Sequence, residues 1–168
     1  MARKTTLSDI WDHTYGFLQA NSTLAAAVTT WSQDLQKAVP DDDEFRSISF
    51  PLLVLCYPPQ EEARFVAYVG QDGAFREVTN LYAMVLTKET ISGGATSYTA
   101  SKSALGIVEK IVSAVKASQQ LVYSGNYAAD ACKVDSIVVR SLRYALDEKS
   151  WYGVARARLV IVNEVGGS

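Results

Sequence analysis

The sequence predicts an α+β domain in which a mostly antiparallel β-sheet carries a long helix on one face, with further helices at the N-terminus. Three observations lead to this prediction. Apolar residues have helical spacing over 6–38, strand-length apolar runs fill 48–89, and a long amphipathic segment over 102–122 precedes a β-rich hairpin over 133–165. Runs of strands gathered between helices are typical of α+β domains. We expect residues 1–168 to form this single domain.

The composition is that of a folded protein with its own core. The chain has 168 residues and a mass of 18.3 kDa, with 48% hydrophobic residues, which is enough to bury a core without disulfides or metals. Its formal net charge of −2 argues against binding nucleic acid through bulk positive charge. No run of about twenty apolar residues predicts a membrane helix, and the N-terminus lacks a signal peptide's apolar core. We therefore expect a cytoplasmic protein without a membrane partner.

Helices are predicted over residues 6–38. Thr6 and Asp9 resemble a capping box, and the apolar residues that follow repeat at the spacing of one helix face. These residues are Leu7, Ile10, Trp11, Phe17 and Leu18. A second set continues the spacing until Pro40, where proline cannot extend a helical hydrogen-bond ladder. This set consists of Leu24, Val28, Trp31 and Leu35. The pattern indicates two short helices or one broken helix.

The acidic run DDDE at residues 41–44 separates the helices from the sheet. Calcium loops place their oxygen ligands at alternate positions around a glycine turn, and this run has neither feature. We expect a solvated turn here and no metal.

The predicted sheet begins with a strand in SFPLLVLCY, whose continuous apolar run indicates burial on both faces and a central position. ARFVAYV, the turn GQDG and AFREV then predict a hairpin between residues 63 and 78. LYAMVLTKE is predicted to be a further strand. Cys56 and Cys132 are isolated in the sequence, so they form no zinc or redox motif and are expected to be buried as small apolar residues.

A flexible loop is predicted over residues 90–101, because this Gly/Ser/Thr-rich stretch has no periodicity. The long helix over 102–122 follows, and its apolar residues fall on one face. They are Leu105, Val108, Ile111, Val112 and Val115. A glycine inside a helix often allows close packing against a sheet, so we expect Gly106 to mark such a contact.

The C-terminal hairpin over 133–165 has two β-rich arms around the polar connector DEKS. Alternation in its second arm places Arg156 and Arg158 on one face. The opposite face receives Ala155, Ala157, Leu159 and Ile161.

Motifs for catalysis, metal binding or cofactor binding are not found. His13 is the single histidine, so every histidine-dependent scheme rests on it. Its position off the apolar face predicts exposure, and its neighbours Asp9 and Asp12 are ordinary for a polar helix face. Gly93 and Gly94 lack the full spacing of a phosphate loop. An anion at the start of the long helix stays open as an alternative to a simple polar cap. We predict that the chain is not an enzyme.

Three regions are the candidate interaction surfaces: the 91–101 loop, the 63–78 hairpin and the arginine-bearing face of the last hairpin. Exposed aromatic and arginine side chains suit protein interfaces. The candidate residues are Ile91, Gly93, Gly94, Tyr98, Arg140, Arg143, Trp151, Tyr152, Arg156 and Arg158. Tyrosines interleaved with arginines also suit single-stranded nucleic acid, but the overall acidity disfavours that alternative.

The order of elements resembles the tail-terminator, or tail-completion, proteins of long-tailed bacteriophages and related contractile injection systems. The resemblance is carried by an N-terminal helix, the buried strand FPLLVLCY, the strand LYAMVLTKE, the helix SALGIVEKIVSAV and a hairpin ending in ARARLVIVNEV. It covers most of the chain and includes no signature motif. The extra hairpin at 63–78 and the stretch at 123–133 depart from the family's compact forms.

This resemblance implies a compact subunit that assembles into a six-fold ring on the tail tube, stops tube polymerisation and joins the tail to the neck. The implied partners are further copies of the chain, the tail tube protein, a neck or head-completion protein and the sheath protein, with DNA only passing through the ring. The implied location is the tail-neck region of the virion, after assembly in the host cytoplasm. Three alternatives stay open: another connector protein, a small-ligand-binding domain using the 91–103 loop, and a nucleic-acid module with salt-dependent binding.

Overall fold

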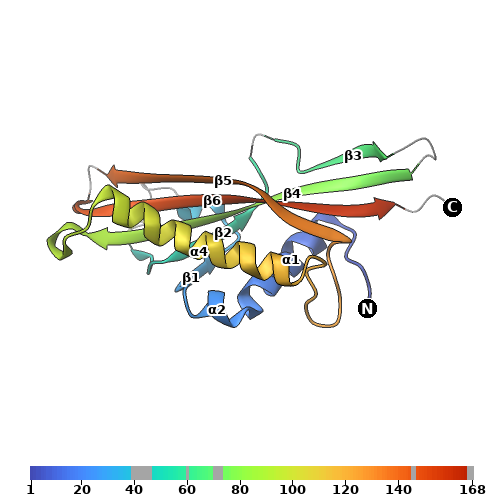
Figure 1. Ribbon diagram of the computed structural model, residues 1–168, viewed down its shortest axis with the longest axis horizontal. Coiled ribbons are helices and arrows are strands. Elements are labelled where there is room, and N and C mark those ends of the chain that lie inside the picture. Colours follow the sequence, from blue (N-terminus) through green and yellow to red (C-terminus); the bar gives the residue numbers. More distant parts are fainter. Residues whose placement is uncertain (39–46, 60, 70–73, 145–146, 166–168) are drawn as a thin grey trace.

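The computed structural model describes residues 1–38, 47–59, 61–69, 74–144 and 147–165. These residues form a six-stranded, mostly antiparallel sheet with the α-helices packed on one face (Figure 1), which confirms the predicted α+β class. The acidic run at 41–44 and the GQDG turn at 70–73 lie outside the described residues.

Helix α1 (Leu7–Ala20) begins as predicted, since the Thr6 side chain accepts a hydrogen bond of 3.1 Å from the backbone N–H of Asp9. The second predicted helix is wrong in most of its length. Helix α2 (Ser22–Ala25) ends after one turn, and Trp31 lies in strand β1 (Thr30–Ser32). A short 3₁₀ helix, η1 (Leu35–Ala38), follows.

The predicted flexible loop over 90–101 is also wrong, because regular structure occupies most of it. A 3₁₀ turn, η2 (Ile91–Gly93), ends at Gly94 in the left-handed conformation, with φ 83°. Helix α4 (Ser97–Ala117) then starts five residues earlier than predicted. Its start is fixed by a capping box in which Thr96 and Thr99 each bond the other's backbone N–H, a pairing that satisfies two donors left free at a helix start.

The strand order of the sheet is β1-β2-β4-β6-β5, with β3 paired to β4. Strand β4 (Ala74–Thr90) is continuous through two segments, AFREV and LYAMVLTKE, that were predicted to be separate strands. Its first part pairs with β3 (Arg64–Val69) and its second part with β2 (Leu52–Cys56), on the same edge. Among the described strands, only β1 and β2 are parallel. Strand β2 is buried along its whole length, as its sequence predicts.

Strands β5 (Ala131–Tyr144) and β6 (Asp147–Val165) form the predicted C-terminal hairpin. The residues DEKS, predicted to be its connector, instead begin strand β6. Strand β6 pairs with β4 from Phe75↔Val165 to Thr90↔Ser150, so these two strands form a continuous ribbon along the molecule (Figure 1).

The two faces of the sheet are covered differently. On the helix face, α1, α2 and α4 enclose the main core with buried residues of β2, β4 and β6, including the predicted face Ala155, Ala157, Leu159 and Ile161. On the opposite face, Leu52, Val54 and Tyr82 belong to a smaller cluster, against which partly buried residues of η1 and the 48–50 segment pack. Cys56 and Cys132 are buried free thiols, as predicted.

Helix and sheet approach each other closely at Gly153, whereas the close contact expected at Gly106 is not present. A Cβ atom at Gly153 would lie 1.9 Å from the carbonyl oxygen of Ala100 in α4. The Thr87 hydroxyl donates to that same oxygen at 3.2 Å, which ties the first turn of the helix to β4. At Gly106, an added Cβ would meet no atom within 4 Å.

Substituting Gly153→Ala is expected to lower the free energy of unfolding by about 3 kcal/mol, because the helix backbone must move away from the sheet. The matched variant Gly106→Ala is expected to raise it by about 0.5–1 kcal/mol, since alanine favours a helix interior over glycine. Urea denaturation of both variants measures these changes. Equal effects of the two substitutions would contradict the assigned contact.

Candidate functional site

The structure brings together several of the predicted interface residues at one end of the sheet. Turn η2, which contains Ile91 and Gly93, follows β4 where Thr90 pairs with Ser150 and contacts strand β6. The Arg143 guanidinium lies 5.4 Å from the ring centre of Trp151 and donates a hydrogen bond to the carbonyl of Glu148. This end therefore combines an exposed 3₁₀ turn with a cation–π pair.

Two predicted residues have opposite degrees of exposure. Tyr98, in the first turn of α4, is 69% exposed, whereas Tyr152 is only 3% exposed. The prediction that Tyr152 belongs to an exposed interface is therefore wrong. Its ring packs edge-on against Phe50 at 5.7 Å, and its hydroxyl donates a 2.6 Å hydrogen bond to Asp147. Tyr152 holds the 48–50 segment on the sheet.

Asp147 is the centre of an ionic cluster next to this tyrosine. Its carboxylate lies 2.9 Å from the Lys88 ammonium. The hydrogen bonds from Tyr152 and Lys88 stabilise the charged carboxylate and lower the pKa of Asp147 to about 2. The cluster joins β6 to the neighbouring β4 at the start of the ribbon.

The arginine-bearing face of β6 is largely neutralised by the chain's own groups. Arg158 makes two hydrogen bonds to Asp135, of 2.8 and 2.9 Å, and this pairing lowers the pKa of Asp135. The Arg156 guanidinium lies 4.4 Å from the ring centre of Tyr82, whose hydroxyl donates to Glu61 at 2.7 Å. Paired charges of this kind do not favour binding to a polyanion.

Arg140 is an exposed residue of strand β5, opposite Val154 in β6. Three consecutive apolar residues of the same strand are also exposed: Ile137, Val138 and Val139. These three residues were not among the predicted interface residues, because a continuous apolar run is typical of a buried strand. Their position in an edge strand, which the sequence alone does not give, leaves them uncovered.

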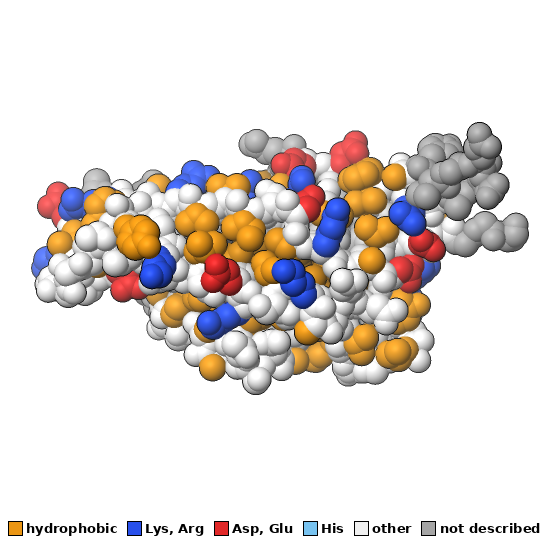
Figure 2. All heavy atoms as spheres, in the orientation of Figure 1, with side chains coloured by type: hydrophobic (Ala, Val, Ile, Leu, Met, Phe, Trp, Pro, Cys, Tyr) orange, Lys and Arg blue, Asp and Glu red, His pale blue; other side chains and the backbone are white. Residues whose placement is uncertain are grey.

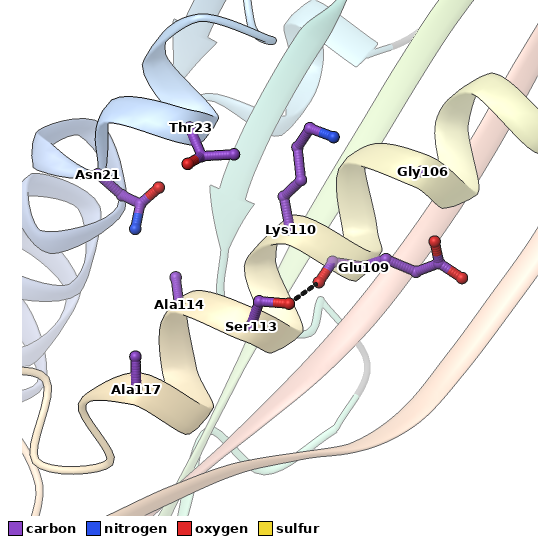
Figure 3. A pocket seen from close by; sticks show the side chains of 8 residues that line it. All are labelled: Asn21, Thr23, Gly106, Glu109, Lys110, Ser113, Ala114 and Ala117. Carbon is purple, nitrogen blue, oxygen red and sulfur yellow. Dashed lines mark hydrogen bonds between the residues drawn. The ribbon is translucent and has the colours of Figure 1, made fainter.

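One hollow, of about 300 Å³, lies between the α1–α2 corner and helix α4 (Figure 3). Asn21 and Thr23 line one side, and Lys110 and Ser113 line the other. Ser113 donates its hydroxyl to the carbonyl of Glu109, while the Glu109 side chain points away along the helix (Figure 3). These polar groups do not converge on one point, so the hollow has no evident ligand-binding geometry.

A second hollow, of about 350 Å³, lies between helix α4 and strand β5. Its wall is mainly apolar and includes Tyr98, Leu105, Gly106 and Val139, with Lys102 and Glu109 at the helix. Figure 2 shows hydrophobic side chains gathered between α4 and β5, with charged side chains around them. This surface suits an apolar side chain better than a charged ligand.

The prediction that His13 is exposed is wrong. The residue is 6% exposed, and its Nε2 atom lies 2.8 Å from the carbonyl oxygen of Leu121. Its ring also packs edge-on against Tyr123 at 5.6 Å. His13 therefore joins α1 to the segment after α4.

Among the described residues, no group of three metal-ligating side chains is found. The search of the same residues for long apolar helices finds none able to cross a membrane. No protein-family model matches the chain, and no curated protein matches it.

The substitution Asp147→Asn is expected to lower the free energy of unfolding by about 1 kcal/mol at pH 7, because the partly solvated ionic cluster is lost. The folded-state pKa lies below the usual 3.8, so this stabilisation is present above pH 4 and disappears as the pH falls towards 2. Urea denaturation at pH 7, 4 and 2.5 measures the difference. Glu148→Gln, on an exposed neighbour, is the control and is expected to have little effect. A constant deficit at all three pH values would contradict this role of the carboxylate.

Proposed function

We propose that this chain is a structural ring subunit that caps the tail tube of a long-tailed bacteriophage or a related injection system. The observation that carries the proposal is the pair of open sheet edges. Strand β5 ends the sheet on one side and β3 extends it on the other, and both carry exposed apolar side chains. An exposed apolar edge strand is a template for pairing with another chain.

The two edges differ in sequence, which favours a ring over a two-fold dimer. When different surfaces of identical subunits meet, the contact repeats from copy to copy and closes into a ring if the rotation permits. A subunit with one acceptor edge and one donor edge has this property. A six-fold ring is the assembly that the resemblance to tail terminators implies.

The internal use of polar groups supports a structural role. Within the described part of the chain, every buried side-chain nitrogen or oxygen has a hydrogen-bond partner. His13 joins two segments, Asp147 joins two strands, and Thr87 joins the sheet to helix α4. Catalytic groups, in contrast, are commonly held in a cleft with perturbed pKa values and open access to a substrate.

In this proposal, the ring stops tube polymerisation and presents a surface to a neck or head-completion protein, with the sheath protein as a further partner. DNA passes through the ring without specific binding. The subunit assembles in the host cytoplasm and resides in the tail-neck region of the virion. Another neck connector would share the same physical properties and differ in its partners.

The test is the mass of the protein in solution across a range of concentrations, followed by negative-stain imaging with tubes of the tail tube protein from the same genome. We expect rings of about six times the 18.3 kDa subunit mass, or capped tube ends formed by a protein that is monomeric alone. A stable monomer that leaves tube ends bare and gains thermal stability from a small molecule would contradict the proposal and favour the ligand-binding alternative.

A further inference from the structure

We propose that the helix-free face of strands β5 and β6 is a docking surface for a protein partner that presents aspartate and glutamate side chains. This inference rests on the proposed ring, because it describes the surface that the ring offers to its partners. Contacts between sheet edges join strands side by side, so they leave this face of each subunit available.

The first step is the face on which the basic residues lie. Directly paired residues of neighbouring strands, and alternate residues of one strand, share a face of the sheet. Arg158 pairs with Tyr82, a residue of the buried cluster on the helix-free face. Arg140 and Lys133 pair with Val154 and Val160, which alternate with Arg158 along β6. Four basic side chains therefore share this face: Lys133, Arg140, Arg156 and Arg158.

The second step is the balance of charge on this face. Asp135 neutralises Arg158 through hydrogen bonds of 2.8 and 2.9 Å. Within the part of the chain that the structure describes, no carboxylate forms an ion pair with Lys133, Arg140 or Arg156. The face therefore has an excess of positive charge, although the whole chain has a formal net charge of −2. Such a local excess favours an acidic partner.

The third step is that one arginine is held ready for contact. The Arg156 guanidinium lies 4.4 Å from the ring centre of Tyr82, and this tyrosine is only 5% exposed. A guanidinium stacked on a ring keeps N–H donors at its edge, and two of them can bind one carboxylate. Holding the side chain in place also reduces the entropy lost on binding. Arginine and tyrosine are among the residues that contribute most to protein interfaces.

Apolar side chains lie next to the same arginine. Arg156 has Met84 of β4 and Val138 of β5 as its direct neighbours on the two adjacent strands. Val138 is 37% exposed. Protein interfaces combine apolar area with arginine and methionine, whereas nucleic acids are held mainly through contacts to their phosphates. The mixed surface therefore suits the acidic side chains of a protein better than nucleic acid.

The first experiment removes the two arginine charges that have no ion-pair partner. In the double variant Arg140→Gln/Arg156→Met, the methionine keeps an apolar cover over Tyr82. The probes are tail tubes and the neck protein encoded by the same genome, and co-sedimentation measures binding at 50, 150 and 500 mM NaCl. We expect the unmodified protein to bind at least one probe, more weakly as the salt concentration rises. The double variant is expected to bind that probe at least tenfold more weakly at 150 mM NaCl.

The matched control is Lys110→Gln/Lys116→Gln, which removes the same number of positive charges from helix α4 on the other face of the sheet. This variant is expected to bind as the unmodified protein does. Equal losses in the two double variants would mean that net charge alone matters, and would overturn the proposal. Circular dichroism and the mass in solution check folding and ring formation. If the arginine double variant does not form rings, Arg156→Met alone, one strand away from the edge, decides the question.

A second experiment uses the lysine on the docking surface. A carbodiimide joins a lysine amine directly to a carboxylate that it contacts, and the reagent takes up the water that is released. In the complex with the bound probe, we expect intermolecular links from Lys133 to aspartate or glutamate of the partner, identified by mass spectrometry. Lys116 is the internal control and is expected to form none. Links from Lys116 without any from Lys133 would contradict the assigned face.

The outcomes separate this inference from the proposed function. If rings form but bind neither probe, or if the arginine double variant binds as well as the unmodified chain, the ring stands and the docking surface is wrong. Binding of duplex DNA that depends on the same arginines, without binding of either protein, would overturn the proposal in favour of the nucleic-acid alternative. A chain that neither forms rings nor caps tubes, yet binds the neck protein through these arginines, would contradict the ring function alone.

Discussion

The close packing of helix α4 against small residues of the sheet is the constraint on which the rest of the structure depends. Gly153 admits the backbone of Ala100 to a distance that no side chain would allow, and Ala83, Ala155 and Ala157 are buried sheet residues of the same core. Larger residues at these positions would lift the helix from the sheet. Because helix α4 packs close to the sheet, its apolar face closes the main core together with α1 and α2.

This arrangement leaves the edges of the sheet available for assembly. The helices cover one face, and the 48–50 segment, held by Phe50 against Tyr152, contributes to the cover on the other face. Neither layer covers the middle of β5 or the exposed residues of β3. A continuous β4–β6 ribbon with an exposed strand on each side is a suitable building unit for a ring, because different surfaces of identical subunits can then meet from copy to copy.

The sequence predicted the elements whose pattern reflects burial. Strand β2, the core face of β6 and the cap at Thr6 follow from local residue patterns and are present in the structure. The predictions failed where tertiary contacts override local pattern. Trp31 has helical spacing with its neighbours but pairs in a strand beside β2, and the Thr96–Thr99 capping box extends α4 into a segment that resembles a loop.

The candidate surface was predicted only in part, for a related reason. His13 and Tyr152 are polar residue types that usually lie near the surface, yet both are buried by contacts from distant segments. Conversely, Ile137 to Val139 have the pattern of a buried strand and are exposed because β5 is the last strand of the sheet. Strand order is a property of the whole fold, and no single stretch of sequence specifies it.

The central claim is that the chain assembles through its two open sheet edges, and amide hydrogen exchange tests it most directly. Backbone N–H groups exchange slowly when they are hydrogen-bonded and protected from water. Comparing dilute protein with the assembled form, we expect new protection in β5 over residues 136–142 and in β3 over residues 64–66, with little change in α4. Assembly without new protection in these strands would contradict the claim.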